Sequence, residues 1–106
     1  MHIQIINFNL KDATEEQYLK ICDELAPTFG SMPGLLTKYW LADTASNTYG
    51  GVYIWKDHAA MSAFLVSKVA AAVISHPNLT NVTSKDFSIL LAPTRVTRGL
   101  PPDLVS

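Results

Sequence analysis

Hydrophobic and polar positions along the chain predict four strands and two helices in the order β-α-β-β-α-β. Strands are expected at residues 2–10, as a pair within 34–55, and at 79–92. These segments are rich in β-branched and aromatic residues and are bounded by turn residues. Helices are expected at 14–30 and 57–75, where apolar residues recur at steps of three and four.

The segment Gly34–Trp55 reads as a hairpin around which the rest of the chain is arranged. Because side chains alternate along a strand, Lys38 and Trp40 share one face of its first strand. Gly51 and Tyr53 share one face of the second, together with Trp55. If the domain has a small-molecule site, we expect this hairpin to form its floor.

Local signals mark the helix ends. Thr14 and Gln17 form a capping box at the start of the first helix, and Pro27 should kink that helix or end its regular part. Asp57 is the expected N-cap of the second helix, which Ser75 and the following residues end.

The element order predicts a ferredoxin-like α+β fold, an antiparallel four-stranded sheet with both helices on one face. The helices cover only one face, and apolar residues occur on both faces of the first and last strands. We therefore expect a homodimer in which two sheets meet through their helix-free faces. Residues 1–92 form this domain, and 93–106 are expected to be an extended, proline-rich C-terminal tail packed on the surface or on a partner subunit.

Composition excludes several classes of protein. A hydrophobic fraction of 48% argues against disorder, and a net charge of −1 with scattered basic residues argues against nucleic acid as a partner. The longest apolar run, residues 70–74, is far shorter than the ~20 residues of a membrane-spanning helix. The only cysteine is Cys22, and no signal peptide is evident, so we expect a cytoplasmic protein.

Short motifs in a fixed order carry a family resemblance over about residues 3 to 92. They are Pro33-Gly34-Leu35, Lys38 with Trp40, Gly50-Gly51-Val52-Tyr53, and Asp57 with Ala63 and Leu65. In these the chain resembles the YdhR-like monooxygenases of the dimeric α+β-barrel superfamily. The resemblance implies a homodimer with a ligand pocket between each sheet and its own helices, and a monooxygenase activity. The superfamily also holds haem-degrading enzymes and isomerases, so the fold constrains the chemistry only weakly.

Lys38 and Tyr53 are the candidate catalytic residues. With Trp40 they could form an aromatic pocket for a flat phenolic substrate, in which Lys38 or Tyr53 stabilises a developing oxyanion. Alternatively the aromatic residues are core or dimer interface and Lys38 extends to water. For Trp55 we favour the core. Gly51, in a glycine pair inside a strand, predicts a bulge or a close approach by ligand that shapes the pocket beside Tyr53.

Asn7, Phe64 and His76 are further candidate substrate-binding residues, because the haem-degrading branch uses an asparagine, a helical tryptophan and a histidine in comparable places. Phe64 stands where that tryptophan would be, and His76 is equally explained as a helix-terminal histidine favoured by the helix dipole. No flavin or nucleotide motif is present, and no two histidines have metal-ligand spacing. We therefore expect no cofactor and no metal.

Three functions remain open from the sequence. The first is a cofactor-independent monooxygenase acting on an aromatic or polyketide-like phenol. The second is a non-catalytic dimer, associated with stress or with binding a hydrophobic ligand. The third is haem binding or degradation.

Overall fold

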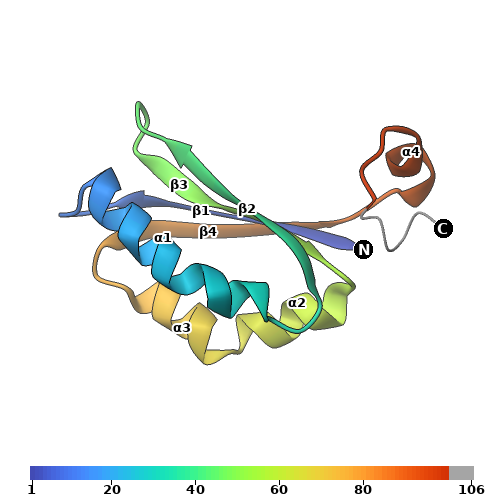
Figure 1. Cartoon of the computed structure of the whole chain (residues 1–106), viewed down its shortest axis with the longest axis horizontal. Helices are drawn as coiled ribbons and strands as arrows, with labels where there is room; N and C mark the ends of the chain where they lie inside the picture. The colour runs from blue at the N-terminus through green and yellow to red at the C-terminus, as the bar shows by residue number, and fades with distance from the viewer. Residues whose placement is uncertain (101–106) are drawn as a thin grey trace.

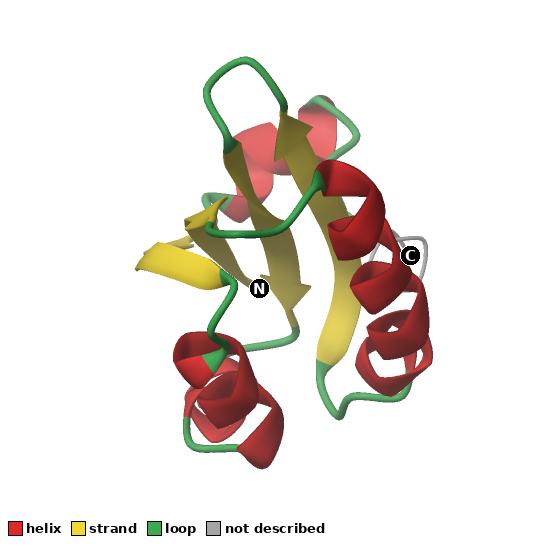
Figure 2. Cartoon of the chain, turned by 90° about the vertical axis from the view of Figure 1, so that its left-hand side faces the viewer, coloured by secondary structure: helices red, strands yellow, loops and turns green. Residues whose placement is uncertain are grey.

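The computed structural model describes residues 1–100 of the chain. Along this part the elements are β1 (His2–Leu10), α1 (Glu15–Gly30), β2 (Leu35–Asp43), β3 (Thr48–Trp55), α2 (His58–Leu65), α3 (Lys68–Ser75), β4 (Leu79–Ser88) and α4 (Leu91–Val96). The four strands form one antiparallel sheet in the order β2-β3-β1-β4. Helices α1, α2 and α3 lie on one side of this sheet, as Figures 1 and 2 show. The predicted ferredoxin-like fold is confirmed.

The inner strand β1 shows which residues lie on each of the two faces of the sheet. Its side chains at even positions are buried and those at odd positions are only partly covered. We call the side under the helices the helix face and the opposite side the free face. Because paired residues point the same way, the register Gln4–Tyr53 and Tyr53–Lys38 places all three side chains on the helix face.

Trp55 lies at the centre of the core and is 0% exposed. Its indole N–H donates a 3.0 Å hydrogen bond to Oε1 of Gln4, and the Gln4 amide donates to Ser84 Oγ at 3.0 Å. Burying Gln4 therefore leaves its amide paired, which removes most of the cost of burying a polar group. The prediction that Trp55 is a core residue is confirmed.

The second helical region is two helices and not one. Val66 ends α2, and the Ser67 side chain accepts a hydrogen bond from the Ala70 N–H, so Ser67 is the N-cap of α3. The two axes differ by 58°. Within residues 1–100 no single helix is long and apolar enough to cross a membrane; only this bent pair has the length and composition, and its Phe64 and Ala70 are buried in the core.

Helix α1 begins with the predicted capping box of Thr14 and Gln17 and ends at Gly30 as expected, with Pro27 inside it. The C-terminal expectation needs correction. Strand β4 ends at Ser88, and the tail contains the short helix α4 where an extended segment was predicted. Pro93 does not prevent this helix because it lies in the first turn, where its missing N–H has no helical acceptor. Residues 101–106 of the predicted tail lie outside the described residues.

Gly50 is required by the backbone of the sheet. Its φ of +148° is unfavourable for other residues, and a Cβ at this position would lie 1.8 Å from the carbonyl oxygen of Ile6. We predict that Gly50→Ala lowers the free energy of unfolding by roughly 2 kcal/mol or more, because β1 and β3 must separate or the backbone must rearrange. Urea unfolding followed by circular dichroism measures the change.

Gly30→Ala is the matched control, since nothing lies within 4 Å of a Cβ built there. We expect this variant to be as stable as the wild type or slightly more so, because alanine favours the helix over glycine. Equal stability of Gly50→Ala and Gly30→Ala would contradict the role assigned to Gly50.

Candidate functional site

Lys38 extends inward from β2 into a cluster of aromatic rings, which we call the ring cluster: Phe29, Trp40 and Tyr53. Its Nζ lies 3.4 Å from the ring centroid of Phe29, 3.5 Å from that of Trp40 and 4.6 Å from that of Tyr53. Phe29 comes from α1, Trp40 from β2 and Tyr53 from β3. The alternative that Lys38 extends to bulk water is therefore wrong.

The register of the hairpin explains this arrangement. Lys38 pairs with Tyr53, and Trp40 pairs with Gly51. A Cβ at Gly51 would lie 2.9 Å from Cε of Lys38 and 3.2 Å from Cε1 of Tyr53. The missing side chain at Gly51 thus provides the space in which the lysine chain lies against the rings.

Burial lowers the pKa of Lys38 to about 7 because the ammonium loses water on entering apolar surroundings. Cys22 acts in the opposite direction on the pKa of Lys38 when its thiol is ionised, and the ring faces also favour the ammonium. Within residues 1–100 no carboxylate pairs with Lys38 to restore its charge. The amine is therefore available in both protonation states near neutral pH.

The neighbouring acidic groups keep their protons. Burial raises the pKa of Tyr53, and burial together with the adjacent Cys22 raises the pKa of Tyr18. Burial also raises the pKa of Cys22, although Tyr18 and Lys38 partly offset the shift. At neutral pH Tyr53 is thus a proton donor, and Cys22 is a protonated thiol on the apolar side of α1.

Three spaces meet at the ring cluster. An inner cavity of about 40 Å³ lies between α1 and the sheet, where Phe8, Cys22, Lys38 and Tyr53 are among its lining residues. Two clefts open beside α1, one of about 180 Å³ and one of about 210 Å³. Trp40 lines all three spaces and is 37% exposed, so its side chain separates the inner cavity from the clefts.

The volumes limit what this conformation can hold. A cavity of about 40 Å³ accommodates water but not an aromatic molecule. Sites for small organic ligands are roughly 300–1,000 Å³. The three spaces reach that range only when joined, which requires the Trp40 indole to turn or α1 to shift.

The structure brings together four of the predicted site residues: Lys38, Trp40, Gly51 and Tyr53. Phe64 lies beside them but on the core side, with its ring 5.6 Å from that of Tyr53 and 5.3 Å from that of Trp55. Phe29, absent from the predicted set, completes the ring cluster. Its position on the apolar stripe of α1 indicated only that it is buried.

The structure does not bring Asn7 and His76 to this site. Asn7 is on the free face, opposite Gly50, and its amide donates to the carbonyl of Tyr49. His76 follows α3, and its Nδ1 accepts a hydrogen bond from the Asn78 N–H. The set expected for haem does not assemble, because these two residues and Phe64 do not line one pocket.

The fold and the lysine among aromatic rings define a ferredoxin-like α+β domain with a candidate ligand site beneath its sheet. The chain belongs to the family described as "Putative mono-oxygenase ydhR", whose model matches residues 3–100. No curated protein sequence matches the chain.

Solved structures of similar fold include several oxygenases. A protein from Deinococcus radiodurans described as a "putative antibiotic biosynthesis monooxygenase" is 15% identical with a TM-score of 0.69, covering 84% of this chain and 92% of its own. SnoaB, a cofactor-independent oxygenase from Streptomyces nogalater, is 18% identical with a TM-score of 0.66, covering 84% and 93%. The haem degrader MhuD from Mycobacterium tuberculosis, solved with two haems, is 20% identical with a TM-score of 0.68, covering 86% and 97%. At these identities the likeness shows the fold.

The lowered pKa of Lys38 predicts a specific dependence of stability on pH. Between about 7 and the ordinary value of 10.5, the unfolded chain binds more protons at this residue than the folded chain does. The destabilisation is full below pH about 7 and is lost as pH rises toward 10.5, so stability increases over this range. We predict that Lys38→Met is more stable than the wild type at pH 6 and that the difference shrinks toward pH 10.

Urea unfolding at pH 6, 8 and 10 measures this difference, in which the other titrating groups cancel. Lys68→Met, which removes an exposed lysine, is the control and should differ from the wild type by the same amount at each pH. A difference between Lys38→Met and the wild type that stays constant with pH would show that the amine is not desolvated.

Proposed function

We propose that the protein is a monooxygenase that oxidises a small aromatic or polyketide-like phenol with O₂. The observation that carries this proposal is the Lys38 amine, which lies among three aromatic rings with its pKa lowered to about 7. A general base is most effective when its pKa is near the working pH. Family membership supplies the reaction class, and the site supports a substrate that is flat and acidic.

The proposed reaction needs few protein groups. The neutral Lys38 amine takes the proton of a phenol, and the Tyr53 hydroxyl donates a hydrogen bond to the resulting oxyanion. The electron-rich anion then reduces O₂. One oxygen atom enters the substrate at a ring C–H, which is a CH₂ in the keto tautomer, and converts that carbon to a carbonyl; the other oxygen leaves as water with the ring hydrogen and the phenolic hydrogen, and all four electrons come from the substrate.

Access to Lys38 depends on Trp40 in this proposal. Trp40 lies on β2, which is an edge strand of the sheet, and it faces α1. Displacing its indole joins the inner cavity to both clefts without breaking the sheet. The substrate ring then replaces the indole against Phe29 and the Lys38 chain.

We propose in addition that the protein is a homodimer that pairs through its free face. A continuous apolar row crosses three strands there, because Val52 pairs with both Ile5 and Tyr39. Tyr39 is 60% exposed and Phe87 on β4 is 52% exposed. Apolar surface of this kind on the uncovered side of a sheet is typical of an interface between subunits.

A cytoplasmic location stays a prediction that rests on the sequence. The single Cys22 cannot form a disulfide within the chain, and its thiol is partly buried.

A non-catalytic protein that binds a hydrophobic ligand is the second candidate. The observation that favours it is the lining of the inner cavity, which is mostly apolar and aromatic. Haem binding has no comparable support, since Asn7 and His76 lie away from the ring cluster.

Oxygen consumption with dihydroxynaphthalene and anthrone substrates tests the proposed reaction. We predict that Lys38→Met lowers kcat by about 10²–10⁴-fold, as expected for loss of a general base. Tyr53→Phe should lower kcat by at least about tenfold, because a donor to the oxyanion is lost while the ring remains. Lys68→Met should behave as the wild type.

Turnover that is unchanged in both variants would overturn the residue roles. Saturable binding of the panel, measured by quenching of tryptophan fluorescence and without oxygen uptake, would identify the protein as the ligand-binding alternative.

Light scattering coupled to gel filtration tests the dimer. We predict a wild-type mass of two chains and a monomer for Val52→Glu, because a carboxylate at the centre of the apolar row would be buried without a partner. Val66→Glu is the control, since Val66 is 87% exposed between α2 and α3 and lies outside the free face; it should remain a dimer. A wild-type monomer at tens of micromolar protein would contradict the proposal.

A further inference from the structure

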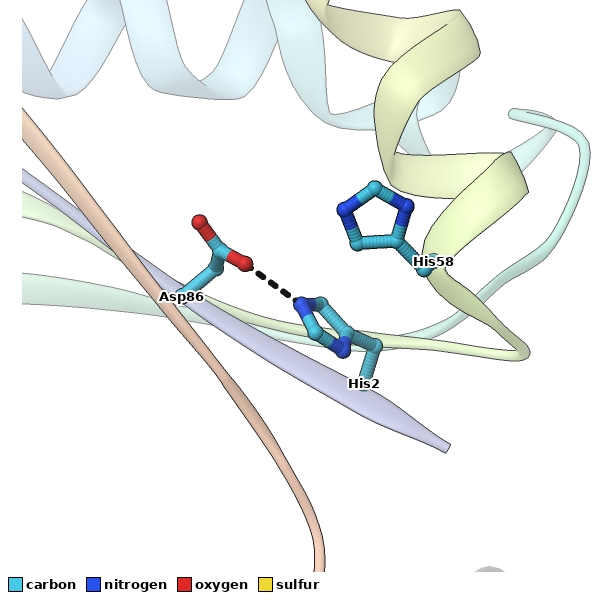
Figure 3. A group of neighbouring side chains, drawn as sticks. All are labelled: His2, His58 and Asp86. Atoms are coloured by element: carbon cyan, nitrogen blue, oxygen red, sulfur yellow. Dashed lines mark hydrogen bonds and ion pairs between the residues drawn. The ribbon is translucent and has the colours of Figure 1, made fainter.

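His2, His58 and Asp86 meet at one end of the helix face (Figure 3). One potential ligand atom from each residue lies within 4.8 Å of the other two. His2 Nε2 is 2.6 Å from Oδ2 of Asp86, and the His2 and His58 rings meet edge to face with centroids 5.0 Å apart. This is the one group of its kind among residues 1–100.

Three separate elements hold these side chains. His2 is the first residue of β1 and is buried, Asp86 lies on β4, and His58 is the first residue of α2. Asp86 pairs with Gln4 and His2 pairs with Ser88, so the histidine and the carboxylate are diagonal neighbours on the helix face. The cluster is therefore fixed by the sheet register and by the start of α2.

The orientation of His58 also favours a shared ligand. Its Nδ1 lies 3.3 Å from Ser62 Oγ one helical turn later. The other ring nitrogen points toward the space above His2 and Asp86, as Figure 3 shows. A hydrogen bond to the distant nitrogen of a histidine is the usual way in which the ring of a metal ligand is oriented.

We propose that His2, His58 and Asp86 bind a divalent transition-metal ion. Two imidazoles and one carboxylate are a common set of three protein ligands for zinc and for non-haem iron, with further positions open to water. Ligand bonds of about 2.0–2.2 Å place the three atoms roughly 3–3.5 Å apart. The side chains reach this spacing by small rotations from their present positions.

The ligand types decide the class of ion. Calcium and magnesium prefer sets made of oxygen atoms alone, whereas imidazole nitrogen suits zinc, iron, cobalt and nickel. The ion would replace the hydrogen now shared between His2 Nε2 and Asp86 Oδ2. It would also join the first strand, the last strand and α2 at one point.

This site goes beyond the proposed function. None of its three residues lines the inner cavity or the two clefts around Trp40. Sequence spacing gave no sign of it, and the expectation of no metal rested on that spacing. The fold brings residues 2, 58 and 86 together across the sheet.

Isothermal titration of the full chain with Zn²⁺, without an affinity tag, tests the proposal. We expect one ion per chain, and we expect His58→Gln and Asp86→Asn each to weaken binding at least about tenfold. Co²⁺ provides a second probe: a visible absorption band should appear with the wild type and be lost in both variants. His58 is exposed, so its substitution leaves the core intact.

His76→Gln is the matched control, since it removes the remaining histidine at a distance from the cluster. It should bind Zn²⁺ as the wild type does. Wild-type binding weaker than millimolar, unchanged binding in His58→Gln and Asp86→Asn, or an equal loss in His76→Gln would each overturn the site. Because the readout is metal binding, failure here leaves the proposed oxygenase reaction unaffected.

Discussion

Alternation of side chains across the sheet is the constraint from which the other features follow. Three helices cover one face only, so each strand residue is either packed beneath them or left on the free face. This rule places Lys38 and Tyr53 together in the interior and puts Asn7, one position from the buried Ile6, on the opposite side. The same alternation leaves the apolar row on the free face uncovered, and this row is the surface through which the proposed dimer pairs.

The site combines features that oppose stability with features that serve chemistry. A lysine among rings loses hydration, and the ring faces return only part of that loss. The glycine pair of β3 gives up side-chain packing, yet Gly50 permits the close approach of β1, and Gly51 leaves space for the lysine chain. Arrangements of this kind persist where the surrounding core is well satisfied, as it is around Trp55 and Gln4.

Local patterns predicted the element order, the two faces of the hairpin, the capping box at Thr14 and the core position of Trp55. They could not predict features that depend on contacts between distant residues. The break between α2 and α3 could not be seen in the sequence, because the apolar spacing continues through it. A lone serine such as Ser67 is only a weak signal of a helix N-cap. Trp40 read equally as core or pocket until its distance to Lys38 was known, and Phe29 read only as a buried residue of the first helix.

The central place of β1 has a consequence for how the molecule is made. This first strand pairs with β3 and with β4, and His2 lies beside Ser88. The sheet therefore cannot close until the residues up to Ser88 have left the ribosome. Contacts between residues so far apart in sequence are slow to form, since the intervening loop must lose its entropy first. Until β4 is available, the edge of β1 that pairs with it keeps its backbone N–H and C=O groups unpaired, and the nascent chain is vulnerable to aggregation.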